Sequence, residues 1–237
     1  MAERRVVEGF TPTTSGLRFA NDFPEGTKAI PWVPASISLP GGRSLTVNDA
    51  SAGLCGGMAF AAIDYFEARR PPDPRTAVPG SDDPLFKHIV QRLLDSWDLP
   101  GGALTYLKLM NPRMTDGHTW WKFWTSGRSR VMVRDEWPKI RADIDGGHPS
   151  PLGLIRVKSW DLGDLKFNHQ VVAWGYELDG DRLTLLLYDP NSPGDENVSM
   201  SLSLAQPDDP TPVTYTPDPG RPTFCFFRVR YTPAPPP

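Results

Sequence analysis

The chain changes its hydrophobic period once, near residue 148, and this change limits the folds that it can adopt. Between residue 53 and this point, the predicted helical segments have apolar residues at intervals of three and four, as on one face of a helix. After it, apolar residues form short runs bounded by turn residues, as in strands. Because helices and strands do not alternate, the order predicts an α+β fold with a helical layer packed on an antiparallel sheet.

Four segments before the change are predicted to be helical. The clearest is "DPLFKHIVQRLLDSWDLPGG" (83–102), in which an amphipathic stripe is followed by a Pro-Gly-Gly stop. The others are "GLCGGMAFAAIDYFEARR" (53–70), "GALTYLKLMNP" (102–112) and "VRDEWPKIRADIDGG" (133–147). The preceding "NDAS" (48–51) offers capping side chains, so Cys55 is expected in or just before the first turn of its helix.

Five segments after the change are predicted to be strands, and they form one antiparallel set. They are "SPLGLIRVKSW" (150–160), "NHQVVAWGYELDG" (168–180), "DRLTLLLYDP" (181–190), "ENVSMSLSL" (196–204) and "FCFFRVRY" (224–231). Asp179-Gly180 is a strong hairpin signal, so it predicts a tight turn between the second strand and the third.

The hydrophobic content of 39% over 237 residues is sufficient for one core, which we expect to span residues 48–231. The first 47 residues hold short apolar pieces split by Gly and Pro, which indicates a loop-rich extended lead-in. Proline-dense stretches at 69–84 and 206–222 are predicted to be surface loops. The final "TPAPPP" (232–237) is predicted to be a disordered tail.

Charge and composition exclude several function classes. With 25 basic and 28 acidic residues, the net charge of -3 gives no basic surface for nucleic acid or an anionic membrane. The N-terminus lacks the apolar run of a secretory signal, and no stretch is long enough to span a membrane, so a monomer in the cytoplasm is expected. We find neither clustered Cys and His ligands nor a phosphate-binding loop, so no metal or cofactor is expected.

Three residues stand where catalytic chemistry needs them. Cys55 opens a helix, His169 opens a strand and Asp189 closes the next strand of the same hairpin. A helix N-terminus and an adjacent imidazolium both favour a thiolate. His169 would then act as base and acid, held in orientation by an acceptor from the paired strand. Asp189 is the first candidate for this acceptor and Asn191 the second.

Each of these residues also has a structural interpretation. Cysteine is one of the most frequently buried residue types, so Cys55 can be a core thiol. We expect this role for Cys225, which lies in an aromatic strand. His169 can be a histidine at a strand edge, and Asp189 with the following Pro and Asn can be an ordinary turn.

The order and spacing of these segments resemble the papain-like cysteine peptidase superfamily, in particular its compact bacterial branch that cleaves double-glycine leaders from bacteriocins. The resemblance rests on "GLCGGMAFAAIDYF" for the nucleophile helix and "NHQVVAWGYELDGDRLTLLLYDPN" for the histidine hairpin with its acidic residue. "IRADIDGGHPSPLGLIRV" corresponds to the helix, turn and strand before the histidine. These pieces cover less than half of the chain.

The resemblance implies a papain-like fold and hydrolysis of a peptide or amide substrate through an acyl-enzyme. It implies Cys55 as nucleophile, His169 as base and Asp189 as orienting group. It also implies an oxyanion-binding side chain about six residues before the cysteine, normally glutamine. Position 49 is Asp here, so we expect the amide of Asn48 to donate this hydrogen bond together with the backbone N–H of Cys55.

Further residues are expected to line the substrate site. They are Gly56, Gly57, Asn168, Trp174 and Asn191, with Trp120 and Trp121. The tryptophans have an alternative role as a cover for the helical layer. Two other functions fit the same pattern: a transglutaminase-like acyl transferase, and a catalytically inactive papain-like binding domain.

Overall fold

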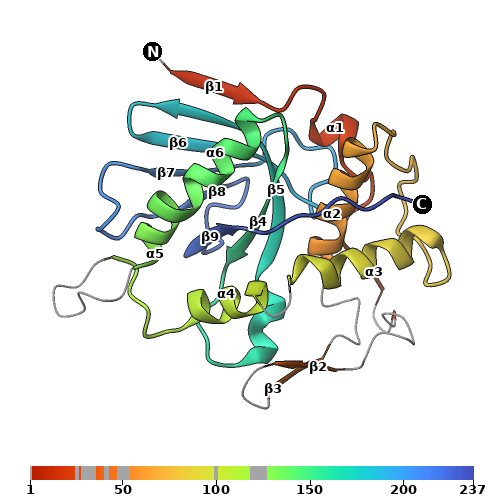
Figure 1. The fold of residues 1–237 in the computed structure, drawn as a ribbon, viewed down its shortest axis with the longest axis horizontal. Helices are drawn as coiled ribbons and strands as arrows, with labels where there is room; N and C mark the ends of the chain where they lie inside the picture. Colours follow the sequence, from red (N-terminus) through yellow and green to blue (C-terminus); the bar gives the residue numbers. More distant parts are fainter. Residues whose placement is uncertain are drawn as a thin grey trace.

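The computed structural model describes residues 2–24, 27, 54–98, 101–117 and 127–237, and the backbone alone of 36–39 and 43–46. Helices and antiparallel strands form an α+β fold, as the change of period predicts (Figure 1).

One antiparallel sheet organises the molecule. Its path is β8-β7-β6-β5-β4-β9, and β1 joins separately by pairing with β5. The strands are β1 (Glu3–Val6), β4 (Ser150–Ile155), β5 (His169–Asp179), β6 (Arg182–Tyr188), β7 (Ser199–Ser203), β8 (Thr214–Thr216) and β9 (Cys225–Arg228). A separate hairpin joins β2 (Ser36–Leu39) to β3 (Arg43–Thr46).

Strand β5 is the centre of this sheet because three strands share it. β4 pairs with its first half and β1 with its second half, while β6 pairs along the other edge from Val172 onward. The turn to β6 has Gly180 at a φ of +56°, which a glycine adopts without strain, and this confirms the predicted hairpin. The first residues of β5 therefore extend beyond β6, and His169 is among them.

Four of the described helices have at least two turns, and they correspond to the four predicted ones. They are α2 (Cys55–Glu67), α3 (Pro84–Ser96), α4 (Gly101–Met110) and α6 (Trp137–Asp145). Shorter elements are α1 (Pro12–Ser15), α5 (Arg128–Arg130), the π-helical turn η2 (Val131–Glu136) and the 3-10 helix η3 (Leu162–Phe167). In Figure 1, α2 runs beside β5, and α3 lies across the lower end of α2.

Helix α2 is buried along most of its length between the sheet and α3. Ala59, Phe60 and Ala62 contact the sheet core. Met58 and Ala61 contact the apolar face of α3. Gly57 allows the two helices to approach closely, because a Cβ there would lie 1.9 Å from the carbonyl oxygen of Ile89.

The N-terminal segment is part of the folded domain, which corrects the predicted boundary after residue 47. β1 extends the sheet, and a buried apolar set follows it: Val7, Phe10, Leu17, Phe19 and Phe23. Short apolar pieces between Gly and Pro do not show helical periodicity, but each of them supplies side chains to a core built by other segments.

The C-terminal residues 232–237 also differ from the expected disordered tail. Arg70 donates hydrogen bonds to the carbonyl oxygens of Pro236 and Pro237, and Ala234 N–H donates to the buried carboxylate of Asp64. Figure 1 shows this end passing across α2. Proline lacks a donor but keeps its carbonyl, so side-chain donors can still fix the segment.

The second Pro-rich loop (206–222) contains a strand that the sequence analysis did not predict. β8 occupies Thr214–Thr216 and pairs with β7, with Tyr215 buried. Among the described residues, no helix is long and apolar enough to cross a membrane.

Candidate active site

Cys55 is the first residue of α2, as the sequence predicts, and it is half-buried. The N-cap is Leu54, whose side chain makes no capping hydrogen bond, and the predicted capping residues 48–51 lie outside the described residues. The side-chain oxygen of Asn21 accepts a hydrogen bond of 2.8 Å from Leu54 N–H. The N-terminal segment thereby helps to fix the position of the thiol.

His169 and Asp189 come together at the end of the sheet nearest to Cys55. His169 Nε2 lies 2.6 Å from Asp189 Oδ1, and both side chains are buried. Because Nε2 is engaged by the carboxylate, Nδ1 is the ring nitrogen left for the thiol, and the ring forms a hydrogen bond with Cys55. The structure thus brings all three predicted residues into one network.

Two further contacts hold the Asp189 carboxylate. Tyr215 of β8 donates its hydroxyl to Oδ2, and the backbone N–H of Asn191 donates to Oδ1 at 2.8 Å. Asn191 is therefore not the acceptor for His169. Its side-chain oxygen instead accepts a hydrogen bond of 3.2 Å from Asn21, which also holds the start of α2.

The electrostatics of the network favour an ion pair between thiolate and imidazolium. Burial raises the pKa of Cys55, but the charge of His169, a hydrogen bond from its ring and one from the backbone of Gln170 outweigh this effect, so the pKa lies below its ordinary value. For His169, burial lowers the pKa, whereas Asp189 and Cys55 raise it to about 9. The lowered pKa of Cys55 and the raised pKa of His169 both stabilise the charged forms.

The pKa of Asp189 moves downward for related reasons. Burial alone raises it, but the charge of His169 and hydrogen bonds from His169, Tyr215 and Asn191 bring it well below the usual range. Asp189 therefore remains a carboxylate and keeps His169 protonated.

Gly56 and Gln170 occupy the inner side of the site. A Cβ on Gly56 would lie 2.5 Å from Ser96 Oγ and 2.8 Å from Gln170 Cδ, so the position has no room for a side chain. Gln170 Nε2 donates to Ser96 Oγ at 3.2 Å. Gly56 therefore packs closely against Ser96 and Gln170 next to the nucleophile.

Three other predicted binding residues have structural roles. Gly57 is enclosed by α3, and Trp174 is buried in the sheet core at an irregularity between β5 and β6. Asn168 bridges elements, since it accepts a hydrogen bond from Arg156 N–H and donates to Met110 Sδ. Proximity to Cys55 or His169 in the sequence led to these predictions, but neighbours in a helix or strand face different directions.

The predicted oxyanion residue Asn48 and the predicted groove residues Trp120 and Trp121 lie outside the described residues.

Cys225 is buried in β9, as expected for a core thiol, and burial raises its pKa. Within the described ranges, no group of three or more Cys, His, Asp or Glu side chains is arranged to hold a metal ion.

The sequence analysis missed four members of the network: Asn21, Arg156, Gln170 and Tyr215. Gln170 follows His169 directly, and "TYT" carries the alternation of a short strand, so both had weak local signals. Asn21 and Arg156 are far from the other site residues in the sequence and only the fold places them there.

A scan against models of protein families finds no match to this chain. Searches among curated proteins and among solved structures likewise find no significant match.

Proposed function

We propose that this chain is a papain-like cysteine hydrolase that cleaves a peptide or amide bond through an acyl-enzyme. The observation that carries the proposal is the connected series of contacts from Cys55 through His169 to Asp189. Folding alone does not require Cys, His and Asp at this position, because burying apolar residues there would cost less free energy than burying charged groups.

In the first half of the reaction, the Cys55 thiolate attacks the carbonyl carbon of the substrate and a C–S bond forms. The His169 imidazolium then gives its proton to the leaving amine as the C–N bond breaks. The N–H of Cys55 belongs to the first turn of α2, where backbone donors have no partner within the helix, so it is suited to the developing oxyanion.

In the second half, neutral His169 takes a proton from water, whose oxygen attacks the thioester carbon. The C–S bond breaks, the acid is released, and the thiolate–imidazolium pair is restored. Asp189 keeps the ring oriented throughout, and Tyr215 and Asn191 keep Asp189 in place. The α+β arrangement with the nucleophile on α2 and the base on β5 supports the papain-like interpretation.

The pH dependence of thiol labelling tests the ion pair. We expect iodoacetamide to alkylate Cys55 with a midpoint below the ordinary thiol value of 9.0, because the lowered pKa supplies thiolate at a lower pH than an ordinary thiol does. Mass spectrometry of the labelled peptides measures the rate at each pH. Cys55→Ala should abolish rapid labelling, whereas Cys225→Ala should leave it unchanged because that thiol is buried.

Hydrolysis should fall as pH rises through about 9, where His169 loses the proton that the leaving group needs. Labelling should not fall there, since alkylation needs only the thiolate. Screening amide and ester substrates with wild type and Cys55→Ala measures this difference. A Cys55 midpoint near 9.0, together with no hydrolysis dependent on Cys55, would refute the proposed function.

A further inference from the structure

Arg156 is a buried cation beside the proposed catalytic network. It follows the last residue of β4, and only 7% of its surface is exposed. Its guanidinium carbon lies 4.8 Å from the centre of the Tyr215 ring, the same tyrosine that donates to Asp189. No ion pair joins Arg156 to a carboxylate of the part of the chain that the structure describes.

Sheet register places Arg156 on the catalytic face. Leu154 lies opposite His169, and residues two apart in a strand share a face, so Arg156 continues the face of His169 beyond the end of β4. Tyr215 lies opposite Met200, and Met200 lies opposite Leu185, so these three residues share one face of the sheet. Asp189 follows Leu185 by four residues and therefore belongs to the same face. Electrostatics agree, because burial lowers the pKa of Arg156 while Tyr215, Asp189 and Cys55 oppose that effect.

The unsatisfied atoms of Arg156 indicate which ligand it suits. Nε and Nη2 are buried, and neither has a hydrogen-bond partner among the residues that the structure describes. These two nitrogens form one edge of the guanidinium, and their N–H groups point in parallel, as bidentate binding of a carboxylate requires. A buried cation with two unpaired donors is costly, and an anion bound along this edge would offset that cost.

We propose that Arg156 binds a carboxylate of the substrate, so that the enzyme prefers acyl compounds with an anionic group near the scissile bond. This inference rests on the proposed function for the identity of the reacting group. The Tyr215 ring lies against the guanidinium of Arg156, and the Tyr215 hydroxyl donates to Asp189, which holds His169. Substrate recognition is thereby linked to the orientation of His169.

Matched electrophiles test the preference. The probes are iodoacetate against iodoacetamide and, for longer reach, N-iodoacetylglycine against N-iodoacetylglycinamide. In each pair the Cys55 thiolate displaces iodide, and only the carboxylate differs. For each pair, the labelling rate of the carboxylate probe is divided by that of the amide probe. In at least one pair, this ratio should be about 10-fold larger for wild type than for Arg156→Gln.

Two variants separate recognition from general electrostatics. Arg156→Lys keeps the charge but lacks the two-pronged edge, so it should lose most of the preference. Arg221→Gln removes an exposed cation that also acts electrostatically on Arg156, and it should retain the preference. If both probes slow equally in Arg156→Gln, Arg156 acts only through Tyr215 and the inference is wrong.

Calorimetric binding to Cys55→Ala keeps the inference testable if the thiol is unreactive or Arg156→Gln does not fold. N-acetylglycine presents a terminal carboxylate and N-acetylglutamate α-amide a side-chain carboxylate, with N-acetylglycinamide as the neutral reference. Tighter binding of a carboxylate ligand, lost in the Cys55→Ala, Arg156→Lys double variant, supports the site and tells which carboxylate it takes. Equal binding of all three overturns it, whatever the reactivity of Cys55.

Discussion

At the scale of single residues, the charge state of the candidate site depends on Asp189. Its carboxylate raises the pKa of His169 to about 9, and the resulting imidazolium lowers the pKa of Cys55. Because the folded pKa of His169 lies above the ordinary 6.5, protonation contributes stability that is complete below that value and is lost as pH rises through about 9.

Asp189→Asn should therefore lower the pKa of His169 by about one unit or more. The amide keeps the shape of the side chain but removes the charge that favours the imidazolium. NMR titration of the ring protons measures the shift, and the alkaline limb of hydrolysis should move to lower pH with it. Tyr215→Phe, which leaves the charge in place, should shift His169 less. An unchanged His169 pKa in Asp189→Asn would show that the carboxylate does not set it.

At the scale of elements, the contact of α2 with α3 determines where the nucleophile lies. Glycine in the interior of a helix normally lowers stability relative to alanine. At position 57 we expect glycine to be more stable than alanine, because the added Cβ would collide with the backbone of α3 at Ile89. Backbone atoms cannot rotate away as a side chain can.

Gly57→Ala should lower the free energy of unfolding by about 3 kcal/mol through this overpacking. Urea denaturation followed by circular dichroism measures the change. Gly80→Ala is the matched control, since a Cβ there meets no atom within 4 Å, and its effect should be close to zero. Equal stability of the two variants would mean that α2 and α3 separate easily.

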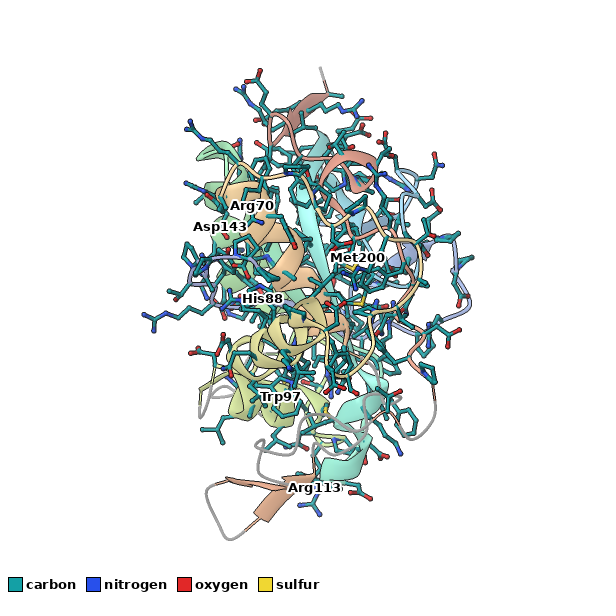
Figure 2. All side chains as sticks on the ribbon, turned by 90° about the vertical axis from the view of Figure 1, so that its right-hand side faces the viewer. Arg70, His88, Trp97, Arg113, Asp143 and Met200 are labelled. Atoms are coloured by element: carbon teal, nitrogen blue, oxygen red, sulfur yellow. The ribbon has the colours of Figure 1, made fainter. Side chains whose placement is uncertain are left out.

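At the scale of the whole molecule, one buried carboxylate joins the chain end to the helices. Asp64 of α2 bonds to Arg92, His88 and Tyr231, and it also accepts the N–H of Ala234. Arg92 in turn donates to the carbonyl oxygen of Thr232. Figure 2 shows His88 and Arg70 on the face formed by α2 and α3, and the hydrogen bonds of Arg70 to residues 236 and 237 extend the attachment.

Deleting residues 232–237 should lower the free energy of unfolding by about 1–3 kcal/mol, because buried groups of Asp64 and Arg92 lose partners. Arg70→Ala removes only the bonds nearest to the chain end and should cost less. Urea midpoints compare the two with wild type. A urea midpoint unchanged by the deletion would show that residues 232–237 do not stabilise the domain.

The sequence by itself determined the four long helices, five of the six strands described in its second half, the hairpin at Gly180 and the α+β class. These features follow from interactions among residues close in the chain, which periodicity and turn residues record. Cys55, His169 and Asp189 were identifiable because each stands at the end of such an element.

Only the tertiary structure decided what surrounds these three residues. Tyr215 reaches Asp189 across 26 positions, and Asn21 reaches Leu54 across 33, so their roles depend on strand order and register. The same holds for the termini, whose weak local patterns concealed β1 and the attachment of residues 232–237 to Asp64. Local composition cannot report a partner that is supplied by a distant segment, because that contact exists only once the sheet has formed.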